Sequence, residues 1–283
     1  MASFTTLFLD QFRLMTSQSF NQKNGIWHPQ EYAKTHTIKL EAYSKGHVPK
    51  EFFTRCHTPS KAVAPFAFAL KEGLRPSDAI DSIGKKPAIL DSGCAYMLVF
   101  YRALFSYLGE EKFNALYQRD RFILRAHPYD TITAIFFKKV VIQDRFNVQP
   151  GDQCCFKNLL SYSFKHGLPE DEYVVCNSDY NFMGLGLQGT QRDVEEALLR
   201  KLNEPTRVVD GGSLSRITMT YEEFINKQTK PPSRNEGRLF LEVLRPDTER
   251  IQQMAETPLD ELDDLLESWC HSYKRYRPDS PTL

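Results

Sequence analysis

The chain has 283 residues, 41% of them hydrophobic, which is enough to bury the core of one large domain. Its 36 basic and 36 acidic residues balance, so neither a nucleic acid nor an anionic membrane is expected as the main partner. The N-terminal MASFTTLFLDQFRLM has no basic leading segment and carries Asp10 and Arg13 among its apolar residues. We therefore expect no cleavable signal peptide and a protein that is cytoplasmic as made, with export by another route left open.

Three zones follow one another along the chain. We interpret residues 1–74 as a mainly helical N-terminal extension, 75–190 as a core that combines helices and strands, and 191–283 as a helical C-terminal extension, although all three could form one domain. At the start of the core, a short helix is expected just after Pro76, with Ser77 as its N-cap. A longer helix then begins near residue 92 and is apolar on nearly every side, which predicts that it is buried.

The rest of the core reads as strands. The β-branched and aromatic TAIFFKKVVI (133–142) is expected to be a strand, and NVQPGDQCCFKN (147–158) a turn followed by a strand. The segments 171–178 and 180–189 are expected to pair as a hairpin. The acidic TPLDELDDLLESW (257–269) is typical of an amphipathic helix. Together these elements predict an α+β fold in which the buried helix packs on a central antiparallel sheet.

Cysteine usage points away from disulfides and metals. The six cysteines are Cys56, Cys94, Cys154, Cys155, Cys176 and Cys270. Their spacing matches neither a disulfide framework nor a zinc site, so no structural metal is expected. Most of them are expected to be small buried hydrophobic residues.

Cys94 has a second interpretation, because it stands in the first turn of the long apolar helix. A thiol there faces unpaired backbone N–H groups and the positive end of the helix dipole, and both favour the nucleophilic thiolate. Asp91 or Ser92 can cap the helix, and Gly93 leaves the approach to the sulfur open. By position alone, a core cysteine at a crowded helix start is the simpler interpretation.

The order of elements along the chain favours the other interpretation, in which Cys94 is a nucleophile. A cysteine on a helix, a PGD turn, a strand and then a hairpin resembles the papain-like cysteine hydrolases and acyltransferases. From Arg75 to Gly189 the chain more closely resembles the bacterial spore-coat type of transglutaminase, protein-glutamine gamma-glutamyltransferase. The resembling pieces are RPSDAI, the Cys94 helix followed by GEEKFNA, GDQCCFKN, EYVV and FMGLG, in the family's order and close to its spacing.

The resemblance implies a papain-like fold and a known chemistry. In that family a cysteine attacks the side-chain amide of a protein glutamine, ammonia leaves, and a lysine amine takes the acyl group to form an isopeptide cross-link. Protein substrates that carry glutamine and lysine are therefore implied, and no metal or organic cofactor. Cys94 matches the nucleophile, and Glu172 matches the catalytic glutamate that takes the place of the papain-like histidine. Glu170 and Asp171 are so near that a short gap would move this assignment.

Two positions depart from the family pattern. Met183 stands where the family has a histidine before the final GLG, and Gly93 stands where it has a glutamate before the nucleophile. Because methionine can neither transfer a proton nor orient a base, an active enzyme needs another group in its place. The candidates are His127, Asp179 and Asp91.

The expected function is thiol acyl transfer, in the form of protein cross-linking by transamidation of glutamine with lysine. A glutamine deamidase or a cysteine peptidase would use the same nucleophile with water as acceptor. A binding protein with a degenerate site is a third hypothesis. The sequence does not indicate an oligomeric state.

Overall fold

The computed structural model of the chain describes residues 2–16, 25–28, 32, 46–56, 67–83, 85–118, 122–126, 132–140, 148–157, 171–178, 181–194, 196–197 and 240–276. Its helices are α1 (Phe4–Thr16), α5 (Pro76–Ile83), α6 (Ser92–Leu108), α7 (Glu110–Gln118), α11 (Thr248–Glu256) and α12 (Leu262–Tyr276), with 3-10 turns η1 (Ile132–Phe136) and η3 (Leu259–Glu261). Its strands are β1 (Ile26–Trp27), β2 (Phe53–Arg55), β3 (Ala67–Leu70), β4 (Ala88–Ile89), β5 (Ile123–Arg125), β6 (Phe137–Val140), β7 (Gln153–Lys157), β8 (Asp171–Ser178), β9 (Asn181–Gly184), β10 (Leu187–Gly189) and β11 (Phe240–Pro246).

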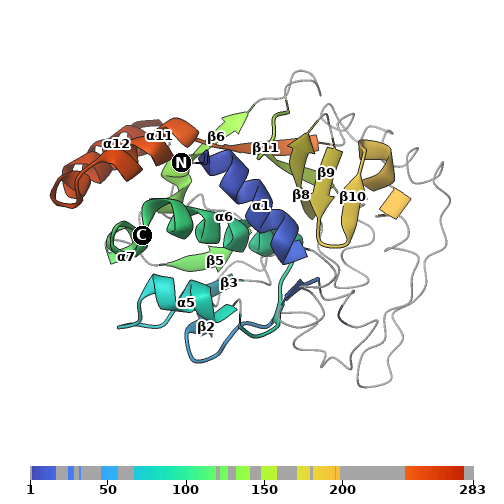
Figure 1. Cartoon of the computed structure of the whole chain (residues 1–283), viewed down its shortest axis with the longest axis horizontal. Coiled ribbons are helices and arrows are strands. Elements are labelled where there is room, and N and C mark those ends of the chain that lie inside the picture. Colours follow the sequence, from blue (N-terminus) through green and yellow to red (C-terminus); the bar gives the residue numbers. More distant parts are fainter. Residues whose placement is uncertain are drawn as a thin grey trace.

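The largest sheet of the described residues is antiparallel and has the strand order β10-β9-β8-β7-β11-β6. The predicted hairpin is confirmed as β8 and β9, and β10 adds a further antiparallel strand. The strand β11 was not predicted, because its segment lies in the zone expected to be helical. It inserts between β7 and β6, so the central sheet is completed by residues far along the chain (Figure 1).

An ion pair between a buried aspartate and a partly exposed arginine fixes β11 in this sheet. Asp152 follows the predicted Pro-Gly turn, in which Gly151 has a φ of 93°. Both oxygens of its fully buried carboxylate accept hydrogen bonds of 2.8 Å from the Arg245 guanidinium of β11. A paired Arg–carboxylate contact of this kind is directional and strong, so the turn that starts β7 also holds β11 beside it.

The helix α6 is the centre of the hydrophobic core, as its all-round apolar sequence predicts. Figure 1 shows α1 lying across it, and the two helices meet through aromatic rings. The Phe8 ring lies 5.3 Å from that of Tyr96, and the Phe4 ring lies 5.5 Å from that of Phe100. Burying each phenylalanine contributes roughly 1.5–3 kcal/mol. The N-terminal segment therefore stabilises the helix that carries Cys94.

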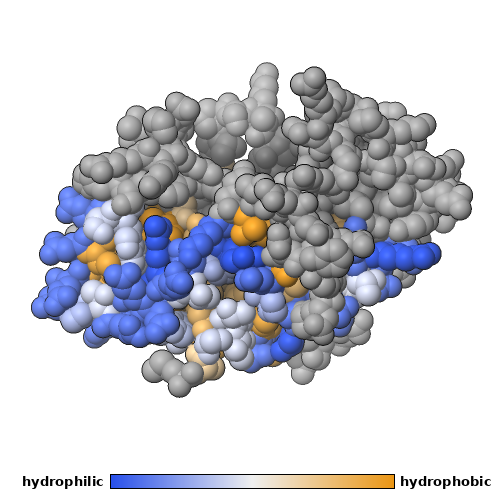
Figure 2. Space-filling model, turned by 90° about the horizontal axis from the view of Figure 1, so that it is seen from above, coloured by the Kyte–Doolittle hydropathy of each residue, from blue (hydrophilic) through white to orange (hydrophobic). Residues whose placement is uncertain are grey.

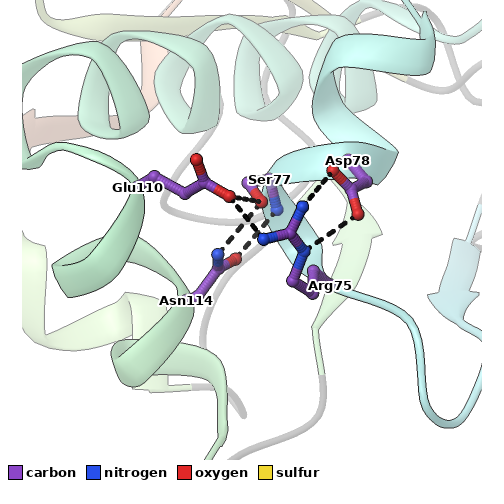
Figure 3. Close-up of polar contacts among 5 residues, drawn as sticks. All are labelled: Arg75, Ser77, Asp78, Glu110 and Asn114. Carbon is purple, nitrogen blue, oxygen red and sulfur yellow. Dashed lines mark hydrogen bonds and ion pairs between the residues drawn. The ribbon is translucent and has the colours of Figure 1, made fainter.

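A polar network at the start of α5 joins that helix to α7 (Figure 3). The helix begins at Pro76, so Ser77 lies inside its first turn rather than at the predicted N-cap. The backbone N–H of Ser77 donates to Asn114 Oδ1 at 3.1 Å, and Asn114 Nδ2 donates to Ser77 Oγ at 3.0 Å. Arg75 contacts both Asp78 at 3.0 Å and Glu110 at 2.7 Å. The RPSD motif thus holds two helices together.

The strand expected at 133–142 is shorter than predicted. Residues 132–136 form the buried 3-10 turn η1, and only Phe137–Val140 is a strand, while the residues after Val140 lie outside the described part. The hydroxyl of Thr133 is fully buried and lies 3.0 Å from that of Tyr117 and 3.3 Å from that of Tyr101. These tertiary contacts favour the turn over the local strand propensity.

The predicted C-terminal acidic helix is confirmed as η3 and α12, and residues 191–194 and 196–197, at the start of the zone expected to be helical, are also helical. On the face seen in Figure 2, the described residues are mostly hydrophilic, with hydrophobic residues in small separate spots. Within the described residues, no helix combines the length and the apolar character needed to cross a membrane. The three-zone boundaries stay a prediction.

Candidate active site

Two short parallel strands bring the start of α6 next to the N-terminal segment. Trp27 of β1 is in register with Ile89 of β4, and the N–H of Leu90 donates to the Trp27 carbonyl at 3.0 Å. Because the strands are parallel, the residues that follow them leave at the same end. His28 and Asp91 are thereby directed to one place.

Asp91 is the N-cap of α6. Its Oδ1 accepts the backbone N–H of Cys94 at 2.6 Å, which satisfies one of the unpaired donors of the helix start. The side chain of Ser92, the other predicted cap, bonds to a neighbouring strand. Its Oγ accepts the N–H of Tyr173 at 2.9 Å. This bond ties β8 to the helix N-terminus and brings the neighbouring residue, Glu172, to the same place.

Glu172 and His28 meet in the interior. Nε2 of His28 lies 3.4 Å from Oε1 of Glu172, and their side chains are 0% and 5% exposed. The charge of Glu172 also raises the pKa of Asp91, so the two carboxylates are close enough to interact. An imidazole and two carboxylates therefore surround the start of the helix that bears Cys94. No sequence pattern singled out His28, because a two-residue strand carries no periodic signal.

The structure buries the Cys94 thiol, whereas its position in the first helical turn led us to expect an accessible thiolate. The side chain is fully buried (0% exposed), and burial raises the pKa of the Cys94 thiol well above its ordinary value. The charge of Asp91 and its hydrogen bond with the thiol act in the same direction, while Arg125 lowers the pKa. Desolvation therefore opposes the helix dipole, which favours the thiolate by at most about 2 kcal/mol.

Burial also raises the pKa of Asp91 from its ordinary 3.8 to about 6. Hydrogen bonds from Cys94 and Gly93 pull this pKa down, and the charge of Glu172 pushes it up. At neutral pH the Asp91 carboxylate is therefore mostly ionised, while the thiol beside it keeps its proton. A weak base next to a neutral thiol is an arrangement that can transfer a proton during attack.

Gly93 does not leave an open approach to the sulfur. A Cβ atom placed on Gly93 would lie 2.4 Å from the Cβ of Ala126 and 3.0 Å from Cδ2 of Tyr173. The helix start is thus pressed against β8 and the residue after β5. A glutamate, which the family has at this position, has no room here, and only glycine allows the close approach.

We expect Gly93→Ala to destabilise the protein by about 1–3 kcal/mol, because the new methyl group overlaps Ala126. Urea denaturation measures this loss. The double variant Gly93→Ala with Ala126→Gly removes the 2.4 Å overlap and should recover part of this loss, because the contacts of 3.0 Å with the Cα of residue 126 and with Tyr173 remain. Helix propensity alone would make Gly93→Ala stabilising, so a single variant as stable as the wild type would contradict the packing explanation.

The remaining predicted residues have different outcomes. His127, Asp179 and Glu170 lie outside the described residues, and so does the side chain of Asp171. Met183 is in β9 opposite Val175, where it is buried in the hydrophobic core. Among the described His, Cys, Asp and Glu side chains, no group of three is placed to hold a metal ion.

Comparisons with known proteins agree with this architecture. The profile of the family described as protein-glutamine gamma-glutamyltransferase matches residues 33–255. A solved structure of a transglutaminase from Geobacillus stearothermophilus, without its C-terminal extension, superposes with a TM-score of 0.50 at 17% sequence identity, covering 91% of this chain and 100% of that one. This likeness supports the predicted α+β fold. No curated protein sequence matches the chain.

Proposed function

Because the chain belongs to the protein-glutamine gamma-glutamyltransferase family, we propose that it cross-links proteins by joining glutamine and lysine side chains through a Cys94 thioester. The observation that carries this proposal is the cluster at the start of α6. There a cysteine in the first helical turn is hydrogen-bonded to one buried carboxylate, with a second carboxylate and an imidazole beside it. Such a set supplies a nucleophile together with groups that accept and return its proton.

In the first half-reaction, the Cys94 sulfur attacks the side-chain carbonyl carbon of a substrate glutamine. The thiol must lose its proton as the S–C bond forms. Asp91, which is hydrogen-bonded to the thiol, accepts this proton, and the charge of Glu172 raises the proton affinity of Asp91. As the C–N bond breaks, this proton passes to the leaving nitrogen, so that ammonia departs. The product is a thioester on Cys94, and the carboxylate is again ionised.

In the second half-reaction, the amine of a lysine side chain attacks the thioester carbon. The N–C bond forms, the S–C bond breaks, and a proton released by the amine returns to the sulfur by way of the carboxylates. The products are an isopeptide bond and the neutral thiol. Each half-reaction therefore uses the same groups in opposite directions.

Burial of Cys94 favours an amine over water as the acceptor. The side chain is fully covered, so a substrate reaches the sulfur only after its cover moves. If the same surroundings close again over the acylated cysteine, they keep water away from the thioester until an amine arrives. This argument places transamidation ahead of deamidation or peptide hydrolysis by the same cysteine.

The test is to incubate the protein with a glutamine-bearing protein whose lysines are blocked, together with fluorescent cadaverine. Incorporation of the amine, seen as fluorescence of the protein band and as the added mass on glutamine, is the expected result. Conversion of glutamine to glutamate without amine incorporation would instead identify a deamidase. If neither product forms, the site is degenerate and the proposal is wrong.

A further inference from the structure

The His28 side chain is the least expected member of the cluster. It lies directly after β1, ahead of the residues 33–255 that the family profile matches. It is fully buried, and its Nε2 faces Oε1 of Glu172 at 3.4 Å. A buried imidazole costs free energy unless its polar atoms have partners, so a position beside a carboxylate calls for an explanation.

Backbone contacts fix both members of this pair. His28 is held by the parallel pairing of β1 with β4 and by its own carbonyl, which accepts the N–H of Tyr32 at 3.0 Å. Glu172 is held in β8 opposite Phe156, and the next residue is bonded to Ser92 of α6. The backbone therefore holds the imidazole and the carboxylate facing each other at 3.4 Å, and only a small shift is needed to form a hydrogen bond between them.

We propose that His28 is a positioning residue, which orients Glu172 and stabilises its negative charge while protons move to and from Cys94. This inference rests on the proposed acyl-transfer function. Among the described residues, Asp91, the N-cap of α6, and Arg125, in β5, act on the Cys94 thiol. Met183, which stands where a histidine was expected from the resemblance, has no imidazole and is buried in the core. His28 therefore supplies the site with an imidazole.

A contact of 3.4 Å is loose for a hydrogen bond. Catalytic hydrogen bonds are often long in the free enzyme and shorten only when the substrate is bound. We therefore expect the pair to act mainly on turnover. Because His28 is covered by its own surroundings and acts through Glu172, its replacement should change kcat rather than KM.

The test compares His28→Gln with His47→Gln. Glutamine keeps a donor near the position of Nε2 but cannot carry charge. His47 is a matched control, because its backbone bonds to Ile89 of β4 while its side chain is exposed. We expect His28→Gln to lower kcat of amine incorporation by about 10- to 100-fold with KM within twofold, and His47→Gln to have little effect.

The pH profile separates positioning from a purely structural role. An imidazolium stabilises the negative charge of a neighbouring carboxylate, and a neutral amide does not. The acid limb of the kcat profile should therefore move to higher pH in His28→Gln. A variant that folds and keeps both the wild-type kcat and the wild-type acid limb overturns the proposal.

A measurement that does not depend on enzyme activity tests this inference separately from the proposed function. The ring resonances of His28 in the wild-type protein can be followed by NMR as the pH is changed, and compared with those of Glu172→Gln. The midpoint for His28 should move to lower pH in the variant, while that for His47 stays in place. An unchanged His28 midpoint overturns the proposal, whether or not the protein transfers amines.

Discussion

Cys94→Ala is expected to abolish amine incorporation, with a loss on the order of 10⁴-fold or more, because no other group in the cluster can carry the acyl chain. The fold should survive, since the replaced side chain is small and alanine is a good helix former. Removing a buried sulfur costs only about 1 kcal/mol. Fluorescent amine incorporation and urea denaturation, measured on the same preparation, separate the two effects.

Cys154→Ala is the matched control for this change. Cys154 is also fully buried and free of disulfide, and burial raises the pKa of its thiol well above the ordinary value. It also lies beside a buried carboxylate, that of Asp152. It sits in β7 rather than at a helix start, so its loss should leave incorporation within about twofold of wild type. Equal losses in both variants would show that the protein needs buried thiols for its fold and not Cys94 for its chemistry.

The parts of the fold with a clear local pattern were predictable from the sequence. The helix α6 is apolar on nearly every side, and that pattern predicted burial. The β8 and β9 strands are β-branched or aromatic segments separated by a short turn. In contrast, β11 is recruited into the sheet by an ion pair between Asp152 and Arg245, which are 93 positions apart. Long-range pairing of this kind leaves no local signature.

The candidate site likewise contains residues that the sequence predicted and one that it did not. Cys94 and Glu172 could be named from ordered motifs, because nucleophile helix and hairpin follow each other at a recognisable spacing. The contact of His28 with Glu172 could not, because it depends on β1 and β4, two strands of two residues each that are far apart in the chain. The burial of the thiol was also hidden, since burial is a property of the whole fold.

Asp91→Asn should remove most of the activity while making the folded protein less sensitive to pH. Asparagine is as good an N-cap as aspartate, so it can still accept the backbone N–H of Cys94. It cannot accept the proton of the thiol. We expect amine incorporation at neutral pH to fall by about 10²- to 10⁴-fold, the usual contribution of a general base. A remaining activity near the wild-type level would assign proton transfer to Glu172 alone.

Asp247→Asn is the control for the capping role. Asp247 is the buried N-cap of α11, where its Oδ1 accepts the backbone N–H of Arg250 at 3.3 Å. Its carboxylate also pairs with Lys138 at 3.0 Å, so the substitution removes a buried charge from a capped helix outside the Cys94 cluster. This variant should lose stability, because Lys138 keeps only Glu249 among the described residues and Arg250 loses its ion pair with residue 247, and should keep the chemistry. Comparable losses of kcat in the two variants would mean that capping, and not proton transfer, explains the effect at Asp91.

The pH dependence of stability tests the state of Asp91 directly. Its pKa is about 6 in the folded protein and 3.8 without burial, so the folded state binds the proton more tightly. The resulting stabilisation is fully present below about pH 4 and is lost as the pH rises through 6, a total of about 3 kcal/mol. In Asp91→Asn this loss is absent. Urea denaturation across this range should therefore show the free energies of unfolding diverging in favour of the variant as the pH rises, because the wild type alone must bury a charge. Curves that stay parallel would mean that Asp91 is ionised without cost, and that solvent or a cation reaches it.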